Sequence, residues 1–203
     1  MASAALPAGL IHQLLPASFR LPPHWLYPAF LLLFLVLLIT GDPGLIDRQR
    51  PWLRVTTGLM IALITGVNAV AAGRLVIDIL TKVTFGTPAQ LLATGAIIWL
   101  TNVIAFGLWY WDVDGGGAAA RLAAGNARDV AYVFPEMTLP ELVPAGWSPA
   151  FVDYLALSFN TATAFGPTDV AAIKRWAKML MIVESVISLA LVTLVVARAV
   201  NVL

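Results

Sequence analysis

The chain of 203 residues is 60% hydrophobic and 11% charged, and its mean hydropathy is +0.88. Soluble globular proteins carry about 25% charged residues, so this composition excludes that class and predicts an integral membrane protein. A formal net charge of +1 leaves no excess of positive charge to bind nucleic acid. Because the sequence contains no cysteine, disulfides, thiolate metal sites and cysteine nucleophiles are excluded.

The apolar runs of the chain predict four membrane spans. A helix rises 1.5 Å per residue, so crossing about 30 Å of hydrocarbon takes roughly 20 apolar residues. The run Trp25–Thr40 comes first and is the shortest of the four, and tilt or inclusion of Leu21–His24 would let it cross. Three longer runs follow: Val55–Gly73, Ala89–Trp111 and Met179–Ala197.

A shorter apolar run lies between the third and fourth spans. Residues 112–147 are polar with seven charges, so we expect them outside the hydrocarbon. Ser148 and Pro149 are typical of a helix start, and Asp153 places negative charge in the first turn. The run Pro149–Thr161 is too short to cross the bilayer, and it indicates a buried or re-entrant helix.

The residues that end this run resemble the pore signature of tetrameric potassium channels, S-F-x-T-x-T-T-V-G-Y-G-D. The stretch Ser158–Asp169 aligns with that signature without gaps. The chain also resembles an uncharacterised group of bacterial four-span membrane proteins with a T-A-F-[S/G]-P-T-D loop, which implies no activity. The residues identical to the channel signature are Ser158, Phe159, Thr161, Thr163, Gly166 and Asp169.

The expected fold is all-α, with four transmembrane helices and a re-entrant pore helix and loop between spans 3 and 4. We expect an N-terminal segment at 1–24, two transmembrane helices within 25–87, and a channel-like pore module at 88–203. The resemblance divides the module into an outer helix at 88–111, a turret at 112–147, a pore helix at 148–162, a filter-like loop at 163–169 and an inner helix at 175–200.

One pore loop cannot enclose a pathway, so the resemblance implies a homotetramer that passes several times through the cell (inner) membrane. Its partners would be the lipid bilayer and monovalent cations, without nucleic acid. The expected pore and filter residues are Thr161, Thr163, Ala164, Phe165, Gly166, Pro167, Thr168 and Asp169.

Four of these residues depart from the channel pattern: Ala164, Phe165, Pro167 and Thr168 stand in place of threonine, valine, tyrosine and glycine. In the family, backbone carbonyls of this loop replace the hydration shell of potassium. The ring of Pro167 fixes its own φ and biases Gly166 toward extended conformations. Thr168 resists the positive φ that glycine adopts freely. We therefore do not expect the stacked ladder of carbonyls to form, and we expect no strong selectivity for potassium over sodium.

Two features of the loop favour cations. The pore helix would point the negative end of its dipole at the axis, and Asp169 in fourfold symmetry would form a carboxylate ring. The hydroxyls of the three loop threonines could face the passing ion. Alternatively, Asp169 forms a hydrogen bond behind the loop or pairs with Lys174 or Arg175. Phe165 could close the axis as a hydrophobic gate or fill space behind the loop.

The inner helix contributes two candidates, Glu184 and Ser188. A carboxyl group inside a span is costly and therefore indicates a functional role. The alternative is a structural role in which Glu184 satisfies pore-helix groups such as Ser158 or Thr161. Ser188 lies near the position of the family's glycine hinge.

Other polar residues of the spans have simpler interpretations. We expect Asn68 and Asn102 to form hydrogen bonds between helices. Arg74 and Asp78 have i,i+4 spacing and are expected to pair.

These observations favour a homotetrameric cation channel with a non-standard filter and weak or unusual selectivity. The alternative is a non-conducting scaffold or accessory membrane subunit that retains the channel fold. We expect no enzyme, because His12 and His24 precede the first span and no zinc-ligand or phosphate-loop spacing is present. We also expect no cofactor and no metal beyond the permeant ion.

The membrane orientation stays open. Eight Lys and Arg residues fall on the turret side and four on the side of the termini. The positive-inside rule places the turret in the cytoplasm, whereas the channel resemblance places it outside the cell.

Overall fold

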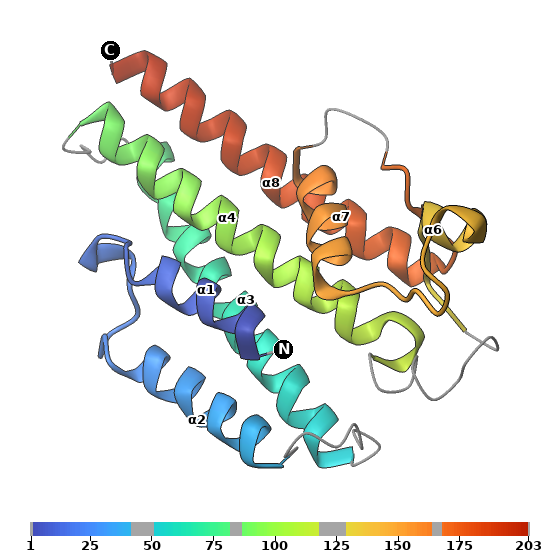
Figure 1. The fold of residues 1–203 in the computed structure, drawn as a ribbon. Helices are drawn as coiled ribbons and strands as arrows, with labels where there is room; N and C mark the ends of the chain where they lie inside the picture. The colour runs from blue at the N-terminus through green and yellow to red at the C-terminus, as the bar shows by residue number, and fades with distance from the viewer. Residues whose placement is uncertain (1, 42–50, 82–86, 118–128, 164–167, 203) are drawn as a thin grey trace.

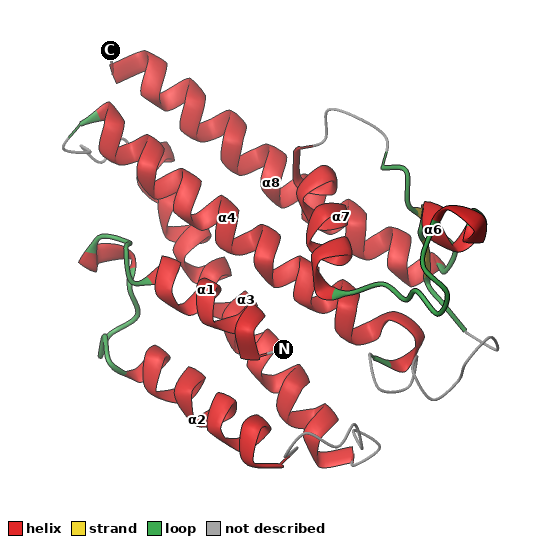
Figure 2. Ribbon diagram, in the orientation of Figure 1, coloured by secondary structure: helices red, strands yellow, loops and turns green. Residues whose placement is uncertain are grey.

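The computed structural model describes residues 2–41, 51–81, 87–117, 129–163 and 168–202. It is mostly helical, as Figure 2 shows. The main helices are α1 (Ala2–His12), α2 (Leu26–Gly41), α3 (Pro51–Leu80), α4 (Pro88–Val113), α7 (Phe151–Thr163) and α8 (Arg175–Val202). The shorter elements are η1 (Ala17–Phe19), η2 (Asp114–Gly116), β1 (Tyr132–Val133), α6 (Pro135–Thr138), η3 (Pro140–Leu142) and β2 (Ala171–Ala172).

Among the described residues, three helices are long and apolar enough to cross a membrane, which confirms a helical membrane protein. They are Trp52–Leu80, Pro88–Val113 and Arg175–Val200, with 29, 26 and 26 residues. A helix of that length extends about 39 Å or more, beyond the thickness of the hydrocarbon layer.

The expected first span is shorter than these three. Helix α2 has 16 residues and extends about 24 Å. The extension through Leu21–His24 that would lengthen it does not form, because the helix begins only at Leu26. Pro22 and Pro23 precede it, and proline lacks the N–H that a helix interior requires.

Helix α4 lies at the centre of the bundle. It packs against α1 and α3 on one side and against α7 and α8 on the other, as Figure 1 shows. In an apolar stretch of 18 residues within each long helix, 67% of the stretch is buried in α4, compared with 39% in α3 and 22% in α8. A helix that is apolar on all sides favours such a central position. Helix α8 therefore leaves most of its apolar surface open.

The N-terminal segment contributes a helix, packed against the bundle along one side, that the sequence pattern did not predict. Helix α1 packs against α4, α3 and α2, and Ala8 is fully buried. A Cβ atom on Gly9 would lie 2.3 Å from Cδ2 of Leu31, so the two helices approach closely at this glycine.

Arg74 of α3 connects to the same segment. Its Nη1 donates to the carbonyl oxygens of Ser18 and Arg20, each at 3.4 Å. These carbonyls lie around the short turn η1, where no helical partner is available to them. The expected ion pair between Arg74 and Asp78 was wrong, since no such pair is present among the described residues.

Candidate functional site

The candidate site is built around α7, a helix of 13 residues between the turret and α8. Its buried side chains follow helical spacing and face α4 and α8; they are Tyr154, Leu157, Ser158, Thr161 and Ala162. Its opposite face is exposed and carries Val152, Ala156, Phe159 and Asn160. The helix therefore lies against the bundle with one side uncovered.

The start of α7 differs from the expected boundary at residue 148. Helix α7 begins at Phe151, and the backbone N–H of Ala150 donates to Oδ2 of Asp153 at 2.7 Å. This contact is one half of a capping box, in which the third helical residue accepts from the residue before the helix. Asp153, rather than Ser148, thus satisfies the first backbone donor.

Glu184 joins three helices at one carboxyl group. The residue is fully buried on α8, and the hydroxyl of Tyr110 on α4 donates to its Oε2. Its Oε1 is hydrogen-bonded to Oγ of Ser158 on α7. Ser158 Oγ also lies 2.7 Å from the backbone oxygen of Val103 on α4. The contact with Ser158 is the one that we expected for a structural carboxyl group.

Asp114 forms a second buried junction at the end of α4. Its Oδ1 accepts from the backbone N–H of Ala131 at 2.5 Å, and its Oδ2 accepts from the Tyr154 hydroxyl at 2.5 Å. Asp114 thereby connects α4, the residue before β1 and α7. The sequence pattern did not predict this role, although an acidic residue between an apolar span and three glycines was a visible signal.

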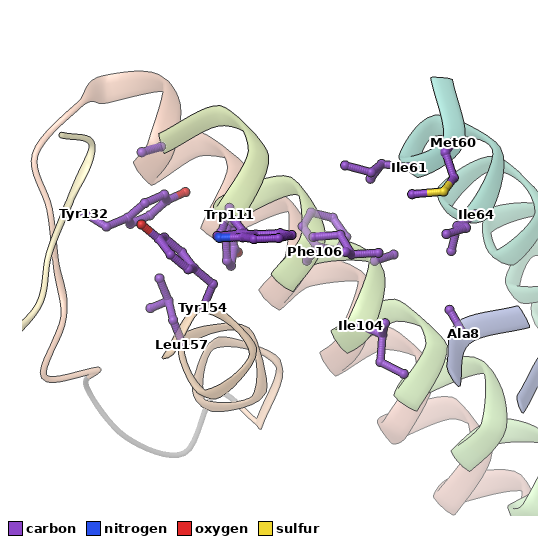
Figure 3. Packing of buried hydrophobic residues seen from close by; sticks show 14 of the residues in the cluster. Ala8, Met60, Ile61, Ile64, Ile104, Phe106, Trp111, Tyr132, Tyr154 and Leu157 are labelled. Carbon is purple, nitrogen blue, oxygen red and sulfur yellow. The ribbon is translucent and has the colours of Figure 1, made fainter. Parts of the chain in front are cut away.

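Aromatic rings fill the space between these two junctions. The ring centroid of Tyr132 lies 5.2 Å from that of Tyr110 and 6.3 Å from that of Tyr154. Figure 3 shows Tyr132 and Tyr154 beside each other at the end of α4 where Trp111 also lies. Burial raises the pKa of the Tyr132 hydroxyl, and the nearby Asp114 raises it further. Tyr132 is therefore neutral in the folded protein.

The segment that follows the filter-like loop is paired with the turret. Strands β1 and β2 are antiparallel, with Tyr132 opposite Ala172 and Val133 opposite Ala171. The N–H of Ile173 donates to the oxygen of Ala131 at 2.8 Å. Both flanks of the loop are thus anchored, one through α7 and the other through this ribbon.

An ion pair between Lys174 and Asp129 extends the connection between ribbon and turret. Because Lys174 pairs with Asp129, the alternative in which it pairs with Asp169 was wrong. Asp169 is exposed, and no ion pair involving it is present in the described part of the chain.

The central residues of the expected filter, Ala164, Phe165, Gly166 and Pro167, lie outside the described residues. The hydroxyls of the flanking threonines donate to backbone oxygens. Thr161 donates to Leu157 at 2.8 Å, Thr163 to Asn160 at 2.9 Å and Thr168 to Val170 at 3.0 Å. Thr161 is also buried within the chain, so its hydroxyl does not face an open path in this protomer.

The second inner-helix candidate, Ser188, is fully buried. Its Oγ accepts from Nδ2 of Asn102 at 3.2 Å, which confirms the hydrogen bond between helices that we expected for Asn102. The corresponding expectation for Asn68 fails, because its buried Oδ1 has no partner in the described part of the chain.

The described residues contain no cluster of His, Asp and Glu side chains able to hold a metal ion. No family model, no curated protein and no solved structure matches the chain. The likeness to potassium channels therefore depends on the loop residues and on the order of the helices.

Proposed function

We propose that this chain is a subunit of a homotetrameric cation channel, with α4 as outer helix, α8 as inner helix and α7 with the loop 163–169 as the re-entrant pore segment. The observation that supports this most is the placement of α7. With 13 residues it extends about 20 Å, too little to cross, yet its inner face is buried against two candidate spans.

The exposed face of α7 supports assembly of several chains. Asn160 is exposed on this face, close to the last carbonyls of the helix. Polar side chains and unpaired backbone groups are tolerated at membrane depth only against protein or water, because lipid offers no hydrogen bonds. A second copy of the chain and a watery pathway would cover this face. The apolar surface of α8, most of which the chain itself leaves uncovered, offers the matching contact.

Electrostatics favour cations as the permeant ions. The C-terminal end of α7 carries a partial negative charge, which points toward the loop. Asp169 follows the loop as an exposed carboxylate and would form a ring of four in the tetramer. The departures at Ala164, Pro167 and Thr168 predict that this channel distinguishes poorly between potassium and sodium.

The proposal includes α2 as a fourth span of a multi-pass protein of the cell membrane. Its exposed side chains are apolar except for Thr40 near its end, and they include Leu32, Leu33, Val36 and Ile39. Such a surface suits lipid rather than water, and local thinning of the bilayer or the tilt of the helix would accommodate its 16 residues.

Recording from purified protein in planar bilayers tests the proposal. We expect currents whose reversal potential follows the total concentration of monovalent cations and not that of potassium alone. Asp169→Asn should reduce the preference for cations over anions, since it removes the carboxylate ring. Glu141→Gln is the matched control, because it removes an exposed carboxylate from the turret and should leave the preference unchanged.

If the wild-type protein carries no current, the variant Phe165→Ala distinguishes a closed channel from a non-conducting scaffold. If Phe165→Ala restores conduction, Phe165 closes the pathway of a true channel. If both proteins are silent, the chain is a scaffold or accessory subunit and the proposal is wrong. Light scattering of the detergent-solubilised protein gives an independent check, since a single protomer in the particle would contradict the tetramer.

A further inference from the structure

The hydroxyl of Ser158 has two oxygen neighbours but only one hydrogen to donate. Its Oγ lies 2.7 Å from the backbone oxygen of Val103 and is also in hydrogen-bond contact with Oε1 of Glu184. A carbonyl oxygen carries no hydrogen, and 2.7 Å is the usual length of a full O–H···O bond. The hydrogen of Ser158 therefore lies between Ser158 and Val103.

The contact between Ser158 and Glu184 then requires a second hydrogen. Without it, lone pairs of two oxygens would face each other and repel. The Tyr110 hydroxyl cannot supply it, because that hydroxyl donates to the other carboxyl oxygen, Oε2. We infer that Glu184 is a neutral carboxylic acid that donates to Ser158, so that hydrogen bonds run from Tyr110 to Glu184, on to Ser158 and finally to Val103.

The surroundings of Glu184 agree with a neutral group. The side chains of Glu184 and Ser158 are fully buried. Among the described residues, the groups that interact with it electrostatically include the hydroxyls of Tyr110 on α4 and Tyr132 on β1, neither of which carries positive charge. No lysine or arginine pairs with it in the described part of the chain. An unpaired carboxylate at this depth would be costly.

The chain of hydrogen bonds gives Glu184 the role of a positioning residue for α7. It connects α8 to α7 through Ser158 and to α4 through Tyr110, and Ser158 completes the connection to Val103. At the next position along α8, Ser185 donates to the backbone oxygen of Thr161 at 3.1 Å. That the helix held in this way is a pore helix rests on the proposed function, whereas the proton on Glu184 does not.

Infrared difference spectroscopy of the purified full chain detects the proton directly. Subtracting the spectrum of Glu184→Gln from that of wild type should leave a band in the carbonyl-stretch region of protonated carboxyl groups. The matched control, Glu141→Gln, changes an exposed glutamate and should leave the bands of an ionised carboxylate. Carboxylate bands in the Glu184 difference would overturn the inference.

Ser158→Ala provides a second test that keeps Glu184 in place. Since the acid then loses its acceptor, the carbonyl band of the protonated group should move to higher wavenumber. A band that does not move would contradict donation from Glu184 to Ser158.

Thermal unfolding in detergent tests the positioning role. Glutamine can donate its amide hydrogen to Ser158 and accept from Tyr110, so Glu184→Gln should stay within about 2 °C of the wild-type Tm. Glu184→Ala leaves both partners unsatisfied and should lower the Tm by about 5–10 °C. Equal losses in the two variants would overturn the inference. None of these measurements depends on conduction, so a failed channel proposal and a failed inference remain distinguishable.

Discussion

Gly107 of α4 lies directly against the backbone of α7 at Leu155. A Cβ atom on Gly107 would be 3.3 Å from the Leu155 Cα and 3.5 Å from the backbone oxygen of Tyr154. A backbone cannot rotate away as a flexible side chain can, so the missing side chain sets the distance between the two helices. Small residues serve this purpose widely at contacts between membrane helices.

Gly107→Ala should therefore destabilise the protein, although alanine is the better helix former. Forcing α7 outward should cost about 1–3 kcal/mol, the usual range for overpacking. Gly58→Ala is the matched control on α3, because its added Cβ would meet no atom within 4 Å other than those of its chain neighbours and its own helix backbone. That variant should gain up to about 1 kcal/mol from helix propensity. Thermal unfolding measures both, and changes of the same sign would contradict the close contact.

The two buried tyrosines beside Glu184 should respond differently to loss of their hydroxyls. Tyr110→Phe removes the donor to Glu184 and should cost about 1–3 kcal/mol. The Tyr132 hydroxyl has no hydrogen-bond partner in the described part of the chain, so Tyr132→Phe should be neutral or stabilising. Unfolding of both variants in the same detergent provides the comparison. A larger loss from the Tyr132 change would refute the assignment of partners.

Asp114→Ala should loosen the connection between the turret and α7. Both donors, the Ala131 N–H and the Tyr154 hydroxyl, lose their buried acceptor. We expect amide exchange at Ala131 to accelerate about tenfold or more, in line with the loss of a charged hydrogen-bond partner. Hydrogen exchange followed by mass spectrometry measures this, with Glu141→Ala as a control that should leave the exchange unchanged.

His12 should make stability depend on pH. The residue lies on α1, outside the three long apolar helices, and is 2% exposed. Burial lowers the pKa of its imidazole from the ordinary 6.5, and the charge of Arg20 lowers it further. The unfolded chain then binds a proton before the folded one does, so stability is complete above about pH 6.5 and falls as the pH drops below it.

The measurement compares Tm values between about pH 8 and about pH 5. His12→Gln should reduce the change in Tm between the two pH values. His24→Gln, which alters an exposed ring, should not reduce it. An unchanged slope in the His12 variant would assign the pH dependence to other groups.

Local patterns were sufficient to predict several elements. Apolar runs located α3, α4 and α8, because a span of that length has few other stable environments. Pro88 marked the start of α4, where Thr87 caps the helix by accepting from the Gln90 N–H. The short apolar run before the loop predicted α7 to within a few residues. The predicted start was too early because Asp153, and not Ser148, satisfies the first backbone donor of the helix.

The partners of the buried polar groups were harder to predict. The contact of Glu184 with Ser158 was one of two interpretations, but its bond to Tyr110 was not foreseen. One of the alternatives for Asp169 was a pair with Lys174, which instead pairs with Asp129, 45 residues earlier. These partners are distant in sequence, and periodicity carries no information about which distant groups meet.

Run lengths alone predicted a helical membrane protein in which a helix too short to cross a bilayer precedes the last long apolar helix. Those features follow from hydrophobic run lengths and from turn residues, which act within a few positions along the chain. The packing of the helices, in contrast, sets the central position of α4, the contacts of α1 with α2, α3 and α4, and the connection of α7 to its neighbours through Glu184 and Asp114. A buried polar group pairs with a partner that the packed helices bring near it, so the identity of that partner depends on the arrangement of all the helices.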